Sequence, residues 1–103
     1  MRYIITESRL DEFINRYLDN IANSNIILER DRFIWIEEID YQDGDGDIFQ
    51  YMEHDDTDGR LWINKIFLKR FSDMFGFDDW VSASKSISGW FENRFNVKVK
   101  FIE

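Results

Sequence analysis

Apolar side chains recur at helical spacing in the first quarter of the chain. The positions are Leu10, Phe13, Ile14, Tyr17, Leu18 and Ile21. The steps of three and four residues place them on one stripe of an amphipathic helix. Thr6 or Ser8 is a suitable N-cap, and Asp11 lies three residues after Ser8 as in a capping box. A helix is therefore predicted from this cap to the Asn-Ser-Asn run at 23–25.

Runs rich in β-branched and aromatic residues predict strands in the rest of the chain, at 1–5, 26–29, 33–41, 48–53, 61–65 and 97–101. The Asp- and Gly-rich segments 43–47 and 55–59 are typical of tight turns between successive strands. This succession predicts an antiparallel meander. Apolar and polar residues do not alternate regularly over 33–36. This favours a strand buried on both faces, as at the centre of a sheet covered by helices.

Two further stripes at helical spacing follow, at Phe67, Phe71, Met74 and Phe75 and then at Trp80, Ala83, Ile87, Trp90, Phe91 and Phe95. Gly76 is placed to end the first of these helices in the left-handed conformation. Asp78 or Asp79 is expected to cap the next helix, and Asn96 to end it. Gly89 lies inside that helix, where we expect another backbone to approach closely.

The resulting order is β-α-β-β-β-β-α-α-β over one domain, residues 1–103. The fold class is therefore predicted as α+β, with three helices packed on a mainly antiparallel sheet. The chain is 44% apolar and 17% aromatic, which is enough to form a core without a metal or disulfide. Because it has no cysteine, the composition excludes disulfides, zinc–thiolate sites and thiol catalysis.

The opening residues turn polar at Thr6, too early for a signal peptide, and no apolar run reaches the roughly 20 residues of a membrane span. We therefore expect a cytoplasmic protein that needs no cofactor and contacts no membrane. The net charge of −8 also argues against phosphate binding, which needs a surplus of Lys and Arg.

The acidic side chains are concentrated in one segment. Residues 33–59 contain ten carboxylates and no Lys or Arg, whereas the rest of the chain carries a net charge of +2. One interpretation is a set of solvent-facing turns and hairpin faces. The other is a docking surface for a basic protein. Its candidate residues are Glu37, Glu38, Asp40, Asp43, Asp45, Asp47, Asp55, Asp56 and Asp58, with Trp35 and Trp62 as aromatic anchors.

Asp43, Asp45 and Asp47 have the spacing that opens an EF-hand loop. The sixth position is Ile48 instead of Gly, the twelfth is His54 instead of Glu, and the flanks are predicted strands, so an EF-hand is excluded. A weak, irregular cation site of the three aspartates and His54 remains open. His54, the only histidine, is either a metal ligand or general base, or a polar residue at the end of a strand.

The pentapeptide at 90–94, Trp-Phe-Glu-Asn-Arg, resembles the Trp-Phe-Gln-Asn-Arg signature of the homeodomain recognition helix. That resemblance implies that its Trp and Phe are core residues while its Asn and Arg face DNA. However, the predicted helix has a net charge of −1, and a strand follows it instead of a basic helical extension. We therefore expect no nucleic-acid binding.

The octet Met-Arg-Tyr-Ile-Ile-Thr-Glu-Ser at 1–8 resembles the start of a group of small uncharacterised proteins of marine phages and metagenomes, which open Met-[Lys/Arg]-x-Ile-Ile-Thr-Glu-Ser. This resemblance implies a phage or aquatic-bacterial origin, hence the host cytoplasm, and no activity. Three functions stay open: a non-catalytic interaction module, which we favour; an acidic nucleic-acid mimic that inhibits a host enzyme; and a weakly metal-dependent enzyme.

Overall fold

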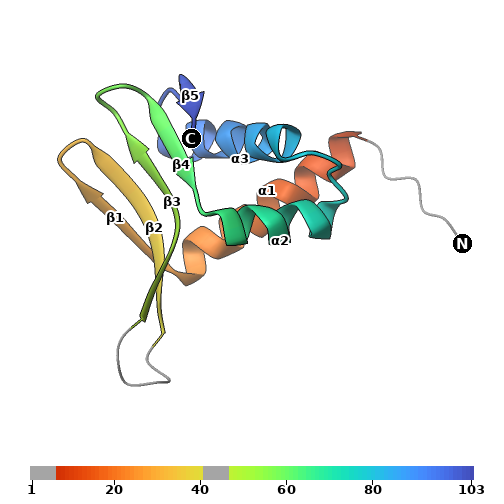
Figure 1. Ribbon diagram of the computed structural model, residues 1–103, viewed down its shortest axis with the longest axis horizontal. Helices are drawn as coiled ribbons and strands as arrows, with labels where there is room; N and C mark the ends of the chain where they lie inside the picture. The colour runs from red at the N-terminus through yellow and green to blue at the C-terminus, as the bar shows by residue number, and fades with distance from the viewer. Residues whose placement is uncertain (1–6, 41–46) are drawn as a thin grey trace, which may run out of the picture.

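The computed structural model describes residues 7–40 and 47–103 (Figure 1). Its elements, in chain order, are α1 (Glu7–Ser24), β1 (Ile26–Arg30), β2 (Phe33–Asp40), β3 (Asp47–Asp55), β4 (Arg60–Ile63), α2 (Lys65–Phe75), α3 (Trp80–Phe95) and β5 (Phe101–Ile102). The α+β class with three helices is confirmed. The strand predicted at 1–5 and most of the turn predicted at 43–47 lie outside the described residues.

The strands form one sheet in the order β1-β2-β3-β4-β5. The first three pairings are antiparallel, as predicted. The sheet is therefore mainly antiparallel, as predicted, but the pairing of β4 with β5 is parallel and departs from the predicted antiparallel meander. Helices α2 and α3 separate these two strands in the sequence, and such a crossover brings the chain back in the same direction.

The final strand is also shorter than the predicted 97–101, because other partners take the backbone groups before it. Val99 N–H donates to the Glu92 carboxylate (2.9 Å), and the carbonyl of Lys98 accepts from the ring of His54 (3.1 Å). Lys100 N–H reaches the carbonyl of Gly59 (2.7 Å), and regular pairing begins only at Phe101.

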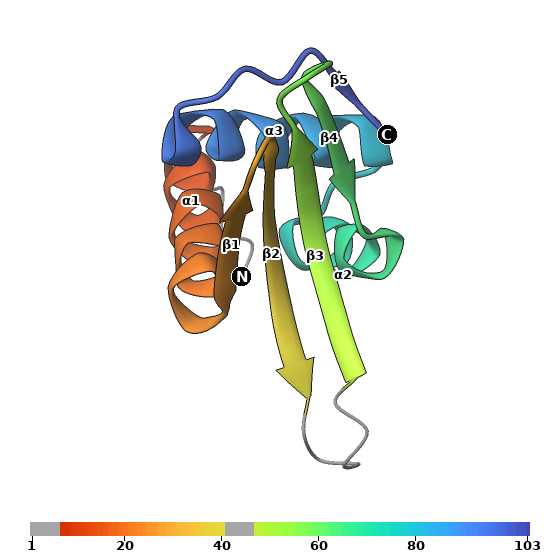
Figure 2. The ribbon, with the colours of Figure 1, turned by 90° about the vertical axis from the view of Figure 1, so that its left-hand side faces the viewer.

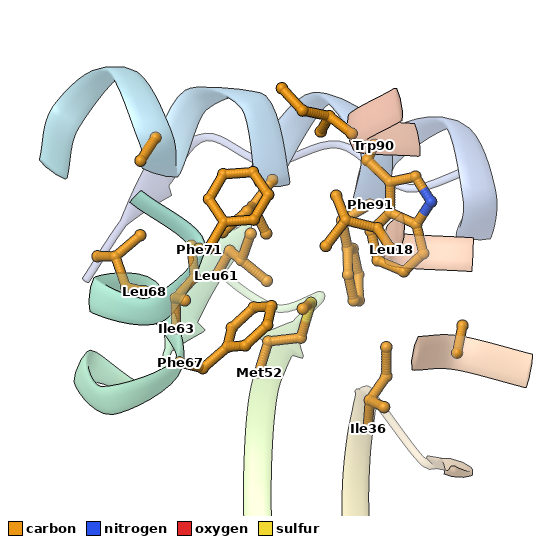
Figure 3. Close-up of a cluster of buried hydrophobic side chains, with 14 residues drawn as sticks. Leu18, Ile36, Met52, Leu61, Ile63, Phe67, Leu68, Phe71, Trp90 and Phe91 are labelled. Carbon is orange, nitrogen blue, oxygen red and sulfur yellow. The ribbon is translucent and has the colours of Figure 1, made fainter. Parts of the chain in front are cut away.

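All three helices cover the same face of the sheet, as the two ribbon views show (Figures 1 and 2). The core lies between the helices and that face. Ile36 and Met52 of the sheet and Phe71 and Phe91 of the helices are fully buried in it (Figure 3). Burial of β2 on both faces was therefore a wrong expectation, because Trp35, next to Ile36, is only half-buried on the uncovered side.

Three of the helix ends follow the predicted chemistry. Gly76 ends α2 in the left-handed conformation (φ 73°). The start of α2 was not predicted: the strand expected at 61–65 ends at Ile63, and the Asn64 side chain caps the helix by accepting from the backbone N–H of its first turn. Asp79, one of the two predicted caps, accepts from Ser82 N–H (2.7 Å) at the start of α3. Asn96 ends α3, also left-handed (φ 54°). The three predicted boundaries, at Gly76, Asp79 and Asn96, are confirmed because capping depends on local sequence alone.

Helix α3 docks on α1 through the residues that resemble a homeodomain signature. Trp90 and Phe91 are buried, and the Trp90 indole N–H donates to Asp19 Oδ1 (2.9 Å). Arg94 Nη1 lies 3.4 Å from the same carboxylate, so this ion pair joins α3 to α1. The expected close approach at Gly89 is wrong, since among the described residues nothing lies within 4 Å of the position a Cβ would take.

Candidate interaction surface

The face of the sheet opposite the helices, which we term the open face, carries a row of aromatic and acidic side chains. Trp35 is the register partner of Glu53, and Glu53 is the partner of Trp62, so the three form one cross-strand row. Side chains alternate along a strand, and the neighbouring Ile36 and Met52 point into the helical core. Trp35, Glu53 and Trp62 therefore share the open face; we call them the open row.

A shallow depression of about 400 Å³ lies beside this row. It is lined by Phe33, Trp35, Glu37, Gln50 and Glu53. Gln50 Nε2 donates to Glu53 across a long contact of 3.4 Å. Within residues 7–40 and 47–103, neither Glu37 nor Glu53 has a Lys or Arg nitrogen within 4.0 Å. The indole ring of Trp35 and two carboxylates therefore line the same depression, and neither carboxylate forms an ion pair within the described residues.

The next carboxylate along β2 has a different role. A bulge shifts the β2–β3 register after Ile36, so Met52 and Tyr51 both contribute to the helical side. The Tyr51 ring meets Phe67 of α2 edge-on at 5.2 Å, and its hydroxyl donates to Glu38 (2.7 Å). The pKa of Tyr51 is raised to about 12, mainly by burial and secondly by the hydrogen bond to the Glu38 carboxylate. Glu38 therefore belongs to the helical side, although it follows Glu37 directly.

Asp55, at the end of β3, is paired with basic groups. Its carboxylate accepts from Thr57 N–H (2.9 Å) and lies 3.4 Å from Arg32 Nε and 3.9 Å from Arg60 Nη2. The Thr57 N–H, and then the two guanidinium groups, hold the pKa of Asp55 below its ordinary value of 3.8. Its negative charge is therefore compensated within the fold.

The remaining predicted acids within the described residues lie near the two opposite ends of β3. Asp47, its first residue, is the register partner of Asp40, whereas Asp56 and Asp58 are exposed in the turn after its last residue. A strand rises about 3.3 Å per residue, so eight steps along β3 separate these ends by about 26 Å. Of the predicted partner-binding residues, the open face therefore brings together Trp35, Trp62 and Glu37.

His54 lies in the core. Its side chain is fully buried, its ring lies 5.6 Å from that of Phe91, and Nε2–H donates to the carbonyl of Lys98 (3.1 Å). Among the described residues, Nδ1 has no hydrogen-bond partner. Asp43 and Asp45 of the suggested cation site lie outside the described residues, and within residues 7–40 and 47–103 no three potential metal ligands are grouped together.

Glu53 is the residue of the open row that sequence reasoning did not select. It stood in the acidic segment as one carboxylate among ten, and its position depends on its partners in β2 and β4. The signal that indicates its face is its alternation with Met52, an apolar residue in a polar stretch.

The chain matches no protein-family model, no curated protein and no solved structure. Within residues 7–40 and 47–103, no helix has both the length and the apolar character needed to cross a bilayer.

Proposed function

We propose that this chain is a non-catalytic interaction module whose open face binds a basic segment of a partner protein. The observation that carries the proposal is the open row, in which two indoles flank Glu53 on the face that no helix covers. Glu37 borders the same depression as Glu53 and Trp35. Aromatic rings and free carboxylates therefore occur together on an accessible surface.

These groups suit the side chains of Arg and Lys. A guanidinium or ammonium group within about 6 Å of an indole face is attracted by the ring, and a nearby carboxylate adds a charge-assisted hydrogen bond. Tryptophan also contributes binding energy at interfaces more often than most residues do. The net charge of −8 would steer a basic partner toward the chain.

The two other functions have less support. A nucleic-acid mimic needs carboxylates spaced like phosphates over a long surface. Here Asp55 is paired with Arg32 and Arg60, which interrupt the acidic surface at one end of the sheet. A metal-dependent enzyme would need an accessible ligand set, whereas His54 is enclosed by the core.

Binding of a nona-arginine peptide, followed by the indole N–H signals in NMR, tests the proposal. We expect the signals of Trp35 and Trp62 to shift, while that of Trp90, held by Asp19, stays unchanged. The double variant Glu37→Gln/Glu53→Gln should weaken binding roughly 3- to 10-fold, the size of two exposed ion pairs.

The matched control is Asp11→Asn/Glu12→Gln, which removes the same two charges from the exposed surface of α1. It should weaken binding less, through the net charge alone, and this smaller loss should disappear at high salt. An equal loss in the two double variants, or shifts that bypass Trp35 and Trp62, would contradict binding at the open face.

A further inference from the structure

A second concave surface lies away from the open face, beside β5. A groove of about 560 Å³ opens between the start of α2, the first half of α3 and residues 99–103. Ile63 of β4 and Leu68 of α2 belong to the core and line the groove from that side (Figure 3). Its volume falls within the range of about 300–1,000 Å³ typical of sites for small organic ligands.

The groove gathers large apolar side chains that are exposed to solvent. Trp80, Val81 and Phe101 are 52%, 63% and 48% exposed, and all three line it. Ser84 and Ser88 lie one turn apart on α3, on the side that faces the groove. Their small side chains leave open the space that larger residues would fill. Exposed aromatic walls beside such a hollow are typical of a ligand site.

Basic side chains surround this apolar groove even though the chain as a whole is acidic. Lys65 of α2, Lys85 of α3 and Lys100 before β5 all line it. The lining carboxylate, Glu103, pairs with Arg60 (3.3 Å). Within the part of the chain that the structure describes, none of the three lysines has a carboxylate within 4.0 Å. The groove therefore combines apolar walls with lysines that form no ion pair within the described residues.

We infer that this groove binds a single-tailed organic anion, with its carboxylate at the lysines and its alkyl chain along the apolar walls. An alkyl chain gains free energy from burial and needs no hydrogen bonds. A peptide would bury backbone N–H and C=O groups that need partners, and the side chains of Val81 and Phe101 offer none. The lysines then select an acid over an alcohol of the same length.

Decanoate, added below its micelle concentration to the full chain, is the probe. We expect the indole N–H signal of Trp80 to shift in a saturable manner while those of Trp35, Trp62 and Trp90 do not. Decan-1-ol should bind at least roughly 3- to 10-fold more weakly, because it lacks the charge that the lysines attract. No saturable Trp80 shift, or equal affinity for acid and alcohol, would overturn the inference.

Two variants identify the parts of the groove. Val81→Glu places a carboxylate at a position that is already exposed, so the fold should persist while decanoate binding is lost. Lys65→Gln/Lys85→Gln should weaken decanoate binding roughly 3- to 10-fold without affecting decan-1-ol. The matched control, Lys69→Gln/Lys98→Gln, removes two lysines that do not line the groove and should bind like the parent chain.

A competing occupant is an acidic peptide. If a peptide of alternating Leu and Glu shifts Trp80 and decanoate does not, the assignment to an alkyl anion is wrong. The result is independent of the open face, because Trp80 reports on the groove whereas Trp35 and Trp62 report on the open row.

Discussion

The same strands build two faces with opposite roles. On the helical side, Ile36 and Met52 are register partners and are fully buried. One residue away along each strand, Trp35 and Glu53 are also partners, yet both are only partly buried on the open face. Alternation along a strand thus separates the residues that stabilise the fold from those available to a partner.

The comparison is most sharply tested by truncating one residue from each face. We expect Met52→Ala to lower the free energy of unfolding by about 2–5 kcal/mol, because it leaves a cavity in the core. Trp35→Ala should cost only about 0.5–1 kcal/mol, the size of a lost cross-strand contact, although it removes more atoms. Urea unfolding followed by circular dichroism measures both. If Trp35→Ala proves as costly as Met52→Ala, the open face is part of the core.

The next test concerns two polar neighbours in β3. His54→Ala should cost about 2–4 kcal/mol, because it empties buried space and leaves the Lys98 carbonyl without its donor. Glu53→Ala, on the open face, should change stability by no more than about 0.5 kcal/mol. His54→Gln retains a donor and should recover part of the loss. Equal costs for His54→Ala and Glu53→Ala would place His54 outside the core.

The sequence predicted the elements of this fold better than their pairing. The end of α2 and both ends of α3 follow from Gly76, Asp79 and Asn96 because capping is a local property. The parallel pairing of β5 with β4 is not local, since it depends on how α2 and α3 pack against each other before the chain returns. Spacing indicates that a strand forms, but not which neighbour it pairs with or in which direction.

The same limit applies to the candidate site. Trp35 and Trp62 were predicted as anchors, but nothing in the sequence indicates that Glu53 lies between them. Alternation places Glu37 and Glu38 on opposite faces of β2, but the bulge that brings the Tyr51 hydroxyl to Glu38 is not evident from the sequence. A segment that is rich in acids and contains no Lys or Arg therefore does not predict one continuous acidic surface.

Asp55 differs from the other acids of the segment, because its carboxylate is paired within the fold and stabilises it. We expect Asp55→Asn to lower Tm by about 2–5 °C at pH 7, since Arg32 and Arg60 lose their shared partner. The pKa of Asp55 is lowered in the fold, so its stabilisation is complete above the ordinary value of 3.8 and is lost as the pH falls through the lowered pKa.

The pH dependence separates this ion-pair role from a packing role. The difference in Tm between the parent chain and Asp55→Asn should therefore shrink as the pH falls below about 4, and thermal unfolding between pH 2 and 7 measures it. The control is Asp56→Asn, an exposed neighbour in the turn that follows β3, whose Tm should follow that of the parent at every pH. A difference for Asp55→Asn that stayed constant down to pH 2 would mean that the side chain acts through packing. Ion pairing would then no longer distinguish Asp55, which stabilises the fold, from Glu53, which is available to a basic partner.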